Sequence, residues 1–401
     1  MSNIPAGNAV IAQSGGPTAV INQSLVGCVE GLREIGAIGR VFGARHAVRG
    51  MIDDQLVDLT DLGVEKLQRI AETPSSALGT SRDKPDEEYC ERIFDRLAAR
   101  EVRYFFYIGG NDSSDTCRIV SEVARSQGYE LRAFHLPKTI DNDLVLNDHT
   151  PGFGSAARFV ACALMGDSLD NIALPGIKID VIMGRHAGFL TAASVLARTE
   201  VGTGPHLIYV PESTFDLDRF IADVDRVYTD QGRCVIAVSE GIHDAEGTPI
   251  AVKIAEQLGV EVERDAHGNV QLSGSGALGD HLANLIKDRL GQKLRVRADT
   301  FGYLQRSFAG CVSEVDAQEA RESGRAAAIE AGRGALEASI TIRRVSDRPY
   351  SVEFVPVPLA DVARKTKTLD QKYISGDADI SDEFRRYAAP LVGPLPTVEG
   401  F

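Results

Sequence analysis

Two aspartates, a lysine and a threonine follow a hydrophobic segment of strand length. That segment spans 131–136, and the sequence Pro-Lys-Thr-Ile-Asp-Asn-Asp follows it at 137–143. Open α/β sheets bind their ligands beyond the carboxyl ends of the strands. Phosphoryl transfer needs a carboxylate that takes the proton of the attacking hydroxyl, a divalent metal and fixed cations. Asp141, Asp143 and Lys138 could supply a base, a metal contact and a cation, although an Asx-turn would also explain the short polar side chains.

Two glycine-rich turns follow other predicted strands. The sequence Ser-Gly-Gly-Pro at 14–17 follows the segment 8–13, and Gly-Gly-Asn-Asp-Ser at 109–113 follows the segment 102–108. Glycines let backbone N–H groups approach a phosphate, and a helix N-terminus favours negative charge. Taken alone, the first turn is equally consistent with a tight connection that binds nothing, and the polar residues of the second with helix capping.

Three further loops carry an arginine, and one strand end carries a glutamate. The loops are Met-Gly-Arg at 183–185, Gly-Tyr-Leu-Gln-Arg at 302–306 and Leu-Gly-Thr-Ser-Arg at 78–82. A forked guanidinium suits phosphate, and Glu240, which closes the segment 234–239, could accept sugar hydroxyls. The alternatives are surface salt bridges for the arginines and a helix-cap role for the glutamate. Their shared position at strand ends favours one common site.

Hydrophobic segments of strand length alternate with amphipathic segments of helix length. The predicted strands are 8–13, 39–44, 102–108, 131–136, 179–183, 206–210 and 234–239. The predicted helices are 18–36, 61–72, 86–100, 113–127, 154–171, 187–198, 216–231, 277–290 and 315–332. This alternation predicts an α/β fold with mainly parallel sheets. A Pro- and Gly-rich break at 150–154 predicts two domains. Residues 243–272 are expected to form a surface excursion, and 340–345 with 352–357 a late β-hairpin.

The composition is that of a folded enzyme of ordinary type. The chain has 401 residues, of which 43% are hydrophobic and 25% charged. Its net charge of -14 argues against binding to nucleic acid or to anionic membranes, which would need a basic face. The six cysteines lack metal-ligand spacing, and the sequence contains neither a signal peptide nor a membrane-spanning segment. We therefore expect a reduced, cytoplasmic protein.

Taken together, in order and spacing, the motifs resemble those of the phosphofructokinase family from Ser14 to Arg306. The resemblance implies two similar Rossmann-like domains with the active site in the cleft between them. It assigns residues 1–152 with 304–360 to a phosphoryl-donor domain. Residues 153–303 with 361–401 would form a fructose 6-phosphate domain.

The resemblance also implies roles for the residues that match the motifs of the family. Asp141 would take the proton of the sugar 1-hydroxyl, with Thr139 beside it. Gly16 and Arg82 would contact the phosphates of the donor. The residues expected to bind the sugar phosphate are Met183, Gly184, Arg185, Glu240, Tyr303 and Arg306.

Within this set, Arg185 would lie near the transferring group, Glu240 would bind sugar hydroxyls, and Tyr303 and Arg306 would bind the 6-phosphate. Arg297, and Lys178 if the register allows, would reach the site of a neighbouring subunit. That arrangement implies a homodimer or a homotetramer.

Two positions indicate the phosphoryl donor. Family members that use ATP carry glycine where this chain has Asp112 and Lys138. A carboxylate and an ammonium there occupy the space that the α-phosphate of ATP needs, and Lys138 can bind inorganic phosphate. This pattern is typical of the pyrophosphate-dependent branch. The expected reaction is reversible phosphoryl transfer from pyrophosphate to fructose 6-phosphate, which gives fructose 1,6-bisphosphate and phosphate.

Mg²⁺ is the expected cofactor, with Asn111, Asp112 and Asp143 as its expected contacts. The family usually has aspartate where Asn111 stands, and asparagine keeps the oxygen ligand but loses the charge. Three alternatives remain open: an ATP-dependent 6-phosphofructokinase, a sedoheptulose 7-phosphate kinase and a non-catalytic sugar-phosphate-binding subunit. The presence of Asp141, Thr139 and Arg185 argues against the last.

Overall fold

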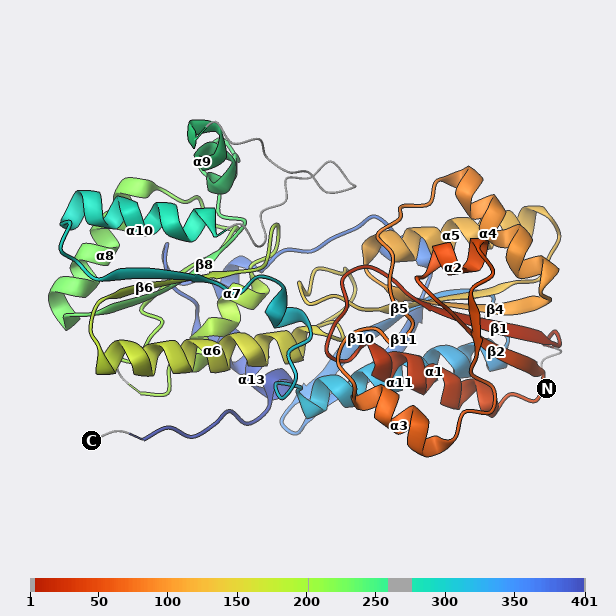
Figure 1. The fold of residues 1–401 in the computed structure, drawn as a ribbon. Helices are drawn as coiled ribbons and strands as arrows, with labels where there is room; N and C mark the ends of the chain where they lie inside the picture. The colour runs from red at the N-terminus through yellow and green to blue at the C-terminus, as the bar shows by residue number, and fades with distance from the viewer. Residues whose placement is uncertain (1–3, 201, 259–275, 400–401) are drawn as a thin grey trace. The chain divides into compact units, whose positions relative to one another are not determined.

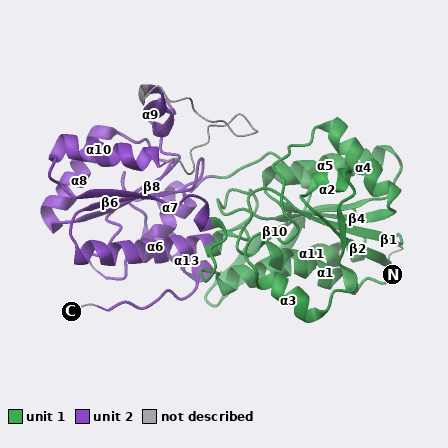
Figure 2. Cartoon of the chain, in the orientation of Figure 1, with its two compact units in different colours: residues 1–155, 306–367 green, residues 156–305, 368–401 purple. Residues whose placement is uncertain are grey.

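The computed structural model describes residues 4–200, 202–258 and 276–399, and the chain divides into two compact units. Unit 1 consists of residues 1–155 and 306–367, and unit 2 of residues 156–305 and 368–401 (Figure 2). Each unit contains one sheet with helices against both faces (Figure 1). The predicted α/β class with mainly parallel sheets is confirmed. Among the described residues, no helix is long and apolar enough to cross a membrane.

The sheet of unit 1 has seven strands in the order β11-β10-β5-β4-β1-β2-β3. Its strands are β1 (Gly7–Gln13), β2 (Ile38–Ala44), β3 (Leu56–Asp58), β4 (Val102–Gly109), β5 (Arg132–Pro137), β10 (Glu337–Asp347) and β11 (Tyr350–Val357). The five inner strands run parallel, and the two edge strands, β3 and β11, run antiparallel to their neighbours. The carboxyl ends of β1, β4 and β5 are therefore neighbours at one edge of the sheet.

Helices cover both faces of this sheet because its inner strands are apolar on both sides. They are α1 (Ile21–Arg33), α2 (Val48–Ile52), α3 (Val64–Glu72), α4 (Glu87–Ala99), α5 (Asn111–Ser126), α11 (Glu314–Arg333) and α12 (Leu359–Val362). Ile11 and Phe106 belong to the core formed with α1 and α11, whereas Val10 and Phe105 belong to the core formed with α4 and α5. α1 and α11 touch closely, because a Cβ added to Gly27 would lie 1.9 Å from the carbonyl oxygen of Arg321.

The sheet of unit 2 has four parallel strands in the order β7-β8-β6-β9. They are β6 (Ile177–Ile182), β7 (Leu207–Tyr209), β8 (Cys234–Ser239) and β9 (Val296–Thr300). The α-helices grouped with this sheet are α6 (Phe153–Ala173), α7 (Phe189–Ala193), α8 (Leu217–Gln231), α9 (Ile250–Leu258), α10 (Ala277–Leu290) and α13 (Asp382–Val392). Three short 3₁₀ helices are η1 (Ser194–Ala197), η2 (Gly302–Arg306) and η3 (Gln371–Tyr373). Ile177 and Ile179 pack into the core with α8 and α10, while Lys178 contacts Asp167 of α6 on the opposite face.

Several elements differ from the sequence-based expectation. β3 and β9 were not predicted, since β3 has only three residues and β9 alternates charged with small or apolar side chains. The helix predicted at 18–36 begins only at Ile21, and the one predicted at 187–198 is α7 followed by a 3₁₀ turn. The expected excursion at 243–272 contains α9, and its remainder from 259 lies outside the described residues. The predicted β-hairpin is confirmed as β10 and β11.

A buried charged network fastens β11 to α11 in unit 1. His149, which is 2% exposed, bonds Asp148 through Nδ1 at 2.8 Å and contacts Glu319 through Nε2. The hydroxyl of Tyr350 donates to the same Glu319 carboxylate at 2.6 Å. Burial by itself would lower the pKa of His149, but the hydrogen bonds to Asp148 and Glu319 outweigh it and raise the pKa. The network is thus most stable with a protonated imidazole.

Candidate active site

The Ser-Gly-Gly turn after β1 lies between two cationic side chains. Gly15 has φ +74°, and a Cβ on it would lie 3.1 Å from Nζ of Lys138. A Cβ on Gly16 would lie 3.1 Å from Cζ of Arg306, and Nζ of Lys138 donates a hydrogen bond to the carbonyl oxygen of Gly16 at 2.8 Å. Side chains at either glycine would therefore displace an ammonium or a guanidinium. Since α1 begins only at Ile21, this turn is a loop and not a helix N-terminus.

Lys138 interacts electrostatically with four other charged side chains of this region. It is only 4% exposed, and burial is the largest cause that lowers its pKa to about 8. The positive charge of Arg306 lowers the pKa further, the charges of Asp141 and Asp143 raise it, and Arg82 has a smaller lowering effect. These couplings place three cations and two carboxylates near one another within unit 1. The combination matches what a bound phosphoanhydride and a general base would need.

The Thr-Ile-Asp-Asn-Asp segment forms a turn whose backbone is held from several sides. The backbone N–H of Asp141 donates to Oγ1 of Thr139 at 3.1 Å, and the N–H of Thr139 donates to the carbonyl of Pro151 at 3.3 Å. The N–H of Lys367 donates to the carbonyl of Asp143 at 2.7 Å. Burial, followed by the neighbouring charge of Asp141, raises the pKa of Asp143 to about 6. The turn is of the serine/threonine type, because the Thr139 hydroxyl and not an aspartate or asparagine side chain accepts the backbone bond, and it holds two interacting carboxylates in place.

The second glycine turn leads directly into α5, which begins at Asn111. The residue that caps α5 is Gly110, so capping does not account for the polar residues that follow it. Oδ1 of Asn111 is buried and has no hydrogen-bond partner within the described residues. Asp112 is more than half exposed and pairs with Lys84 at 3.3 Å. Lys84 was not among the residues predicted from the sequence, because its pairing with Asp112 depends on the folding of a distant loop.

Unit 2 gathers a second set of predicted residues at the ends of β6 and β8. Met183, Gly184 and Arg185 follow β6, and Glu240 follows β8, whose last residue Ser239 is the register partner of Ile182. Oγ of Ser239 donates to the carbonyl of Gly184 at 2.6 Å, which ties the two loops together. Glu240 is buried at 6% exposure. Met183, Gly184, Arg185 and Glu240 thus lie on adjacent strand ends, as a common site requires.

Lys178 and Arg297 lie elsewhere on the same sheet. They are register partners on β6 and β9, and Lys178 precedes Met183 by five residues. At about 3.3 Å per residue, Lys178 lies roughly 16 Å from Met183, and Arg297 lies roughly 10 Å from the end of β9 at Thr300. Arg297 is exposed, whereas Lys178 is buried and pairs with Asp167 and Asp170.

Tyr303 and Arg306, both assigned to the 6-phosphate on sequence grounds, have different surroundings. Tyr303 is 48% exposed and belongs to unit 2. Arg306 belongs to unit 1, where its guanidinium packs against Gly16 and lowers the pKa of Lys138. Arg306 therefore sits with the residues assigned to the donor, a neighbour relation that its position in the sequence did not reveal.

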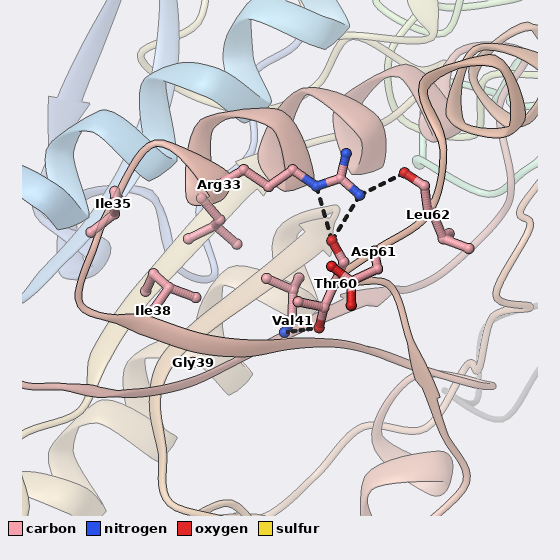
Figure 3. A pocket seen from close by; sticks show the side chains of 9 residues that line it. Arg33, Ile35, Ile38, Gly39, Val41, Thr60, Asp61 and Leu62 are labelled. Carbon is pink, nitrogen blue, oxygen red and sulfur yellow. Dashed lines mark hydrogen bonds between the residues drawn. The ribbon is translucent and has the colours of Figure 1, made fainter.

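A separate hollow of about 430 Å³ lies beside the amino-terminal half of β2 (Figure 3). Leu32, Ile38 and Val41 contribute to its lining. Arg33 reaches across it and donates to the carbonyls of Thr60 at 2.8 Å and Leu62 at 2.7 Å. Because β1 and β2 are parallel, this hollow is at the opposite end of the sheet from the Ser-Gly-Gly turn. It includes none of the candidate residues.

Comparison with known proteins decides the family. Residues 8–329 match the family described as Phosphofructokinase. The chain belongs to the phosphofructokinase family. The matched range contains every candidate residue from Gly16 to Arg306, and it ends before β10.

Similar proteins include phosphofructokinases with a defined phosphoryl donor. The chain is 58% identical over 388 residues to the pyrophosphate--fructose 6-phosphate 1-phosphotransferase of Rhodospirillum rubrum, which covers 96% of this chain and 94% of that protein. Its fold resembles that of the pyrophosphate-dependent phosphofructokinase of Nitrosospira multiformis, with a TM-score of 0.86 and 33% sequence identity. The match covers 99% of this chain and 95% of that one. The pyrophosphate-dependent phosphofructokinase of Marinobacter aquaeolei gives a TM-score of 0.84 at 33% sequence identity. This match covers 98% of this chain and 94% of that one.

Proposed function

We propose that this phosphofructokinase catalyses reversible phosphoryl transfer from pyrophosphate to the 1-hydroxyl of fructose 6-phosphate. The products are fructose 1,6-bisphosphate and phosphate. One observation carries the choice of donor: the ammonium of Lys138 is buried against the Gly16 carbonyl in the turn after β1. A fixed cation at that point suits a compact inorganic phosphate and takes up room that a nucleotide would need. The 58% identity to the Rhodospirillum rubrum enzyme supports the same donor.

In this proposal Asp141 is the general base. It takes the proton of the sugar 1-hydroxyl as that oxygen attacks the terminal phosphorus of pyrophosphate. The hydrogen bond from its backbone N–H to Oγ1 of Thr139 fixes the start of the turn and so orients the carboxylate. In the reverse direction the protonated Asp141 returns the proton to the sugar oxygen.

Three cations of unit 1 would stabilise the phosphate oxygens. Lys138, Arg82 and Arg306 are the groups whose charges interact at the Ser-Gly-Gly turn. With a pKa of about 8, Lys138 still carries its proton at neutral pH. Arg185 would assist at the transferring group, and Asp112 would narrow the donor pocket together with Lys138.

The proposal includes Mg²⁺, held by Asn111, Asp112 and Asp143. Oδ1 of Asn111 is buried and lacks a hydrogen-bond partner within the described ranges. Such an oxygen could serve as a ligand for a hard cation. The raised pKa of Asp143 fits a carboxylate that a cation would help to ionise. Asp112 would have to leave Lys84 to take part. When bound, Mg²⁺ neutralises charge on the phosphoryl oxygens.

Unit 2 would supply residues for fructose 6-phosphate. Met183, Gly184 and Arg185 would line the sugar phosphate, Glu240 would bind hydroxyls, and Tyr303 would contact the 6-phosphate. Arg297 is the register partner of Lys178, five residues before Met183, and its side chain is exposed, so we place it in the site of another copy of the chain. This requires a homodimer or a homotetramer. A cytoplasmic location agrees with six cysteines that are all free thiols.

Initial rates test the proposal directly. Fructose 6-phosphate and Mg²⁺ are supplied with pyrophosphate in one series and with ATP in another. We expect turnover with pyrophosphate and little with ATP. Turnover with ATP alone would refute the reading of Lys138, and failure with both donors would refute the proposed reaction.

A further inference from the structure

Unit 2 contains a group of three carboxylates outside the candidate active site. Asp167 comes from α6, Asp180 from β6 and Asp299 from β9. One oxygen of each lies within 4.8 Å of the others. Asp180 and Asp299 are register partners in the parallel pair of β6 and β9, so their side chains project from the same face of the sheet.

The most buried member of the group has an unsatisfied oxygen. Asp180 is 1% exposed, and its Oδ2 has no hydrogen-bond partner among the residues that the structure describes. Oδ2 of Asp167 is likewise buried and has no hydrogen-bond partner among the described residues. Buried carboxylate oxygens without a donor or a cation are strongly unfavourable. A positively charged partner near each of these oxygens would therefore stabilise the folded protein.

The nearby lysine does not fill that role. Nζ of Lys178 contacts Oδ1 of Asp167 and the exposed Asp170, one helical turn further along α6. It thus neutralises the outer side of the group. Without a cation, the group must hold a proton on carboxyl oxygens that face one another.

We propose that Asp167, Asp180 and Asp299 bind a hard divalent cation, of the class of Mg²⁺, Mn²⁺ or Ca²⁺. A ligand set made only of carboxylate oxygens favours these ions over Zn²⁺ or Cu²⁺, which prefer nitrogen or sulfur. Asp299 is exposed, so water can complete the coordination from that side. The cation would join α6, β6 and the edge strand β9, which carries Arg297. It is distinct from the proposed catalytic Mg²⁺, whose contacts are all in unit 1.

Mn²⁺ binding to the full chain tests the proposal. After treatment with EDTA and desalting, bound Mn²⁺ is measured by electron paramagnetic resonance for the wild type, Asp299→Asn and Asp170→Asn. Asp299 is exposed, so its replacement leaves the core intact. We expect Asp299→Asn to lose one Mn²⁺ per chain, or to weaken that site by about 10- to 100-fold or more. Asp170→Asn makes the same charge change beside Lys178 and should retain the site.

Thermal unfolding provides a second readout. Mn²⁺ should raise the Tm of the wild type and of Asp170→Asn, because a ligand that binds only the folded state stabilises it. The rise should be smaller in Asp180→Asn, even if that variant differs in its starting Tm. Equal Mn²⁺ stoichiometry and affinity in the wild type and Asp299→Asn would overturn the proposal. In that case Asp167 and Asp180 share a proton and bind no metal.

Discussion

Replacing Lys138 with methionine should weaken catalysis and strengthen the fold at the same time. The side chain is buried, and its pKa falls from the ordinary 10.5 to about 8. That fall corresponds to about 3 kcal/mol of unfavourable free energy for keeping the ammonium in the folded protein at neutral pH. The hydrogen bond to the Gly16 carbonyl returns about 1.5 kcal/mol, as is usual when one partner is charged. Lys138→Met should therefore be more stable than the wild type by about 1–2 kcal/mol at pH 7.

The stability difference between Lys138→Met and the wild type should depend on pH in a defined direction. Below pH 8 the lysine is protonated in both folded and unfolded chains, so the full penalty is present. Between pH 8 and 10.5 the unfolded chain binds more protons, and the stability of the wild type rises with pH. The advantage of Lys138→Met should shrink over that range and vanish before pH 10.5, because the hydrogen bond to Gly16 then outweighs the remaining penalty. Urea unfolding followed by far-ultraviolet circular dichroism measures it, since the chain has no tryptophan.

The catalytic half of the prediction uses the same variant. Loss of a fixed donor to a phosphoryl oxygen should lower kcat/KM for pyrophosphate by about 10²- to 10³-fold. In the wild type, kcat/KM should decline above pH 8 as the ammonium is lost, and Lys138→Arg should move that decline to higher pH. The exposed Lys66, replaced by methionine, is the matched control and should change neither quantity. A Lys138→Met variant that is less stable, or fully active, would refute the reasoning.

Three further predictions concern the base, the donor and the stability of unit 1. Asp141→Asn should lower kcat by about 10²- to 10⁴-fold with little change in the KM for fructose 6-phosphate, and a kcat within a few-fold of wild type would exclude Asp141 as the base. Asp112→Gly combined with Lys138→Gly should gain measurable turnover with ATP, and an unchanged ATP rate would count against the steric account of donor choice. Because hydrogen bonds to two carboxylates raise the pKa of His149 above 6.5, its stabilising contribution is complete below pH 6.5 and is lost as pH rises through the folded value. The stability difference between the wild type and His149→Gln, measured by urea unfolding, should therefore be larger at pH 6 than at pH 9.

The elements that could be predicted from the sequence are those with long apolar runs. β4 and β8 are buried along almost their whole length, so their sequences are continuously hydrophobic and easily recognised. β9 was missed because it is an edge strand, on which the charged Arg297 and Asp299 alternate with less polar residues. α13 was not predicted, since the helix contains Pro390, and a proline inside a sequence usually argues against a helix there.

The loops of the candidate site could be predicted because local sequence determines them. Glycines and short polar residues at the ends of β1, β4 and β5 are recognisable without a structure. Their long-range partners are not. The approach of Arg306 to Gly16 joins residues 290 positions apart, and no local pattern shows which arginine makes the contact. The same holds for the pair of Asp112 and Lys84, which depends on how the loop after Leu78 folds back.

Unit 1 is built from two stretches of the chain that are far apart in the sequence, and this affects how the nascent chain can fold. β10 is the parallel neighbour of β5, and α11 packs against α1 so closely that Gly27 and Gly324 tolerate no side chain. When only residues 1–155 have left the ribosome, the edge of β5 and the side of α1 that packs against α11 have no partners, because β10 and α11 lie beyond residue 305. An unpaired strand edge and an exposed apolar helix face are the features that favour aggregation during synthesis. Unit 1 begins at the N-terminus, yet its folding must wait until nearly the whole chain has been made.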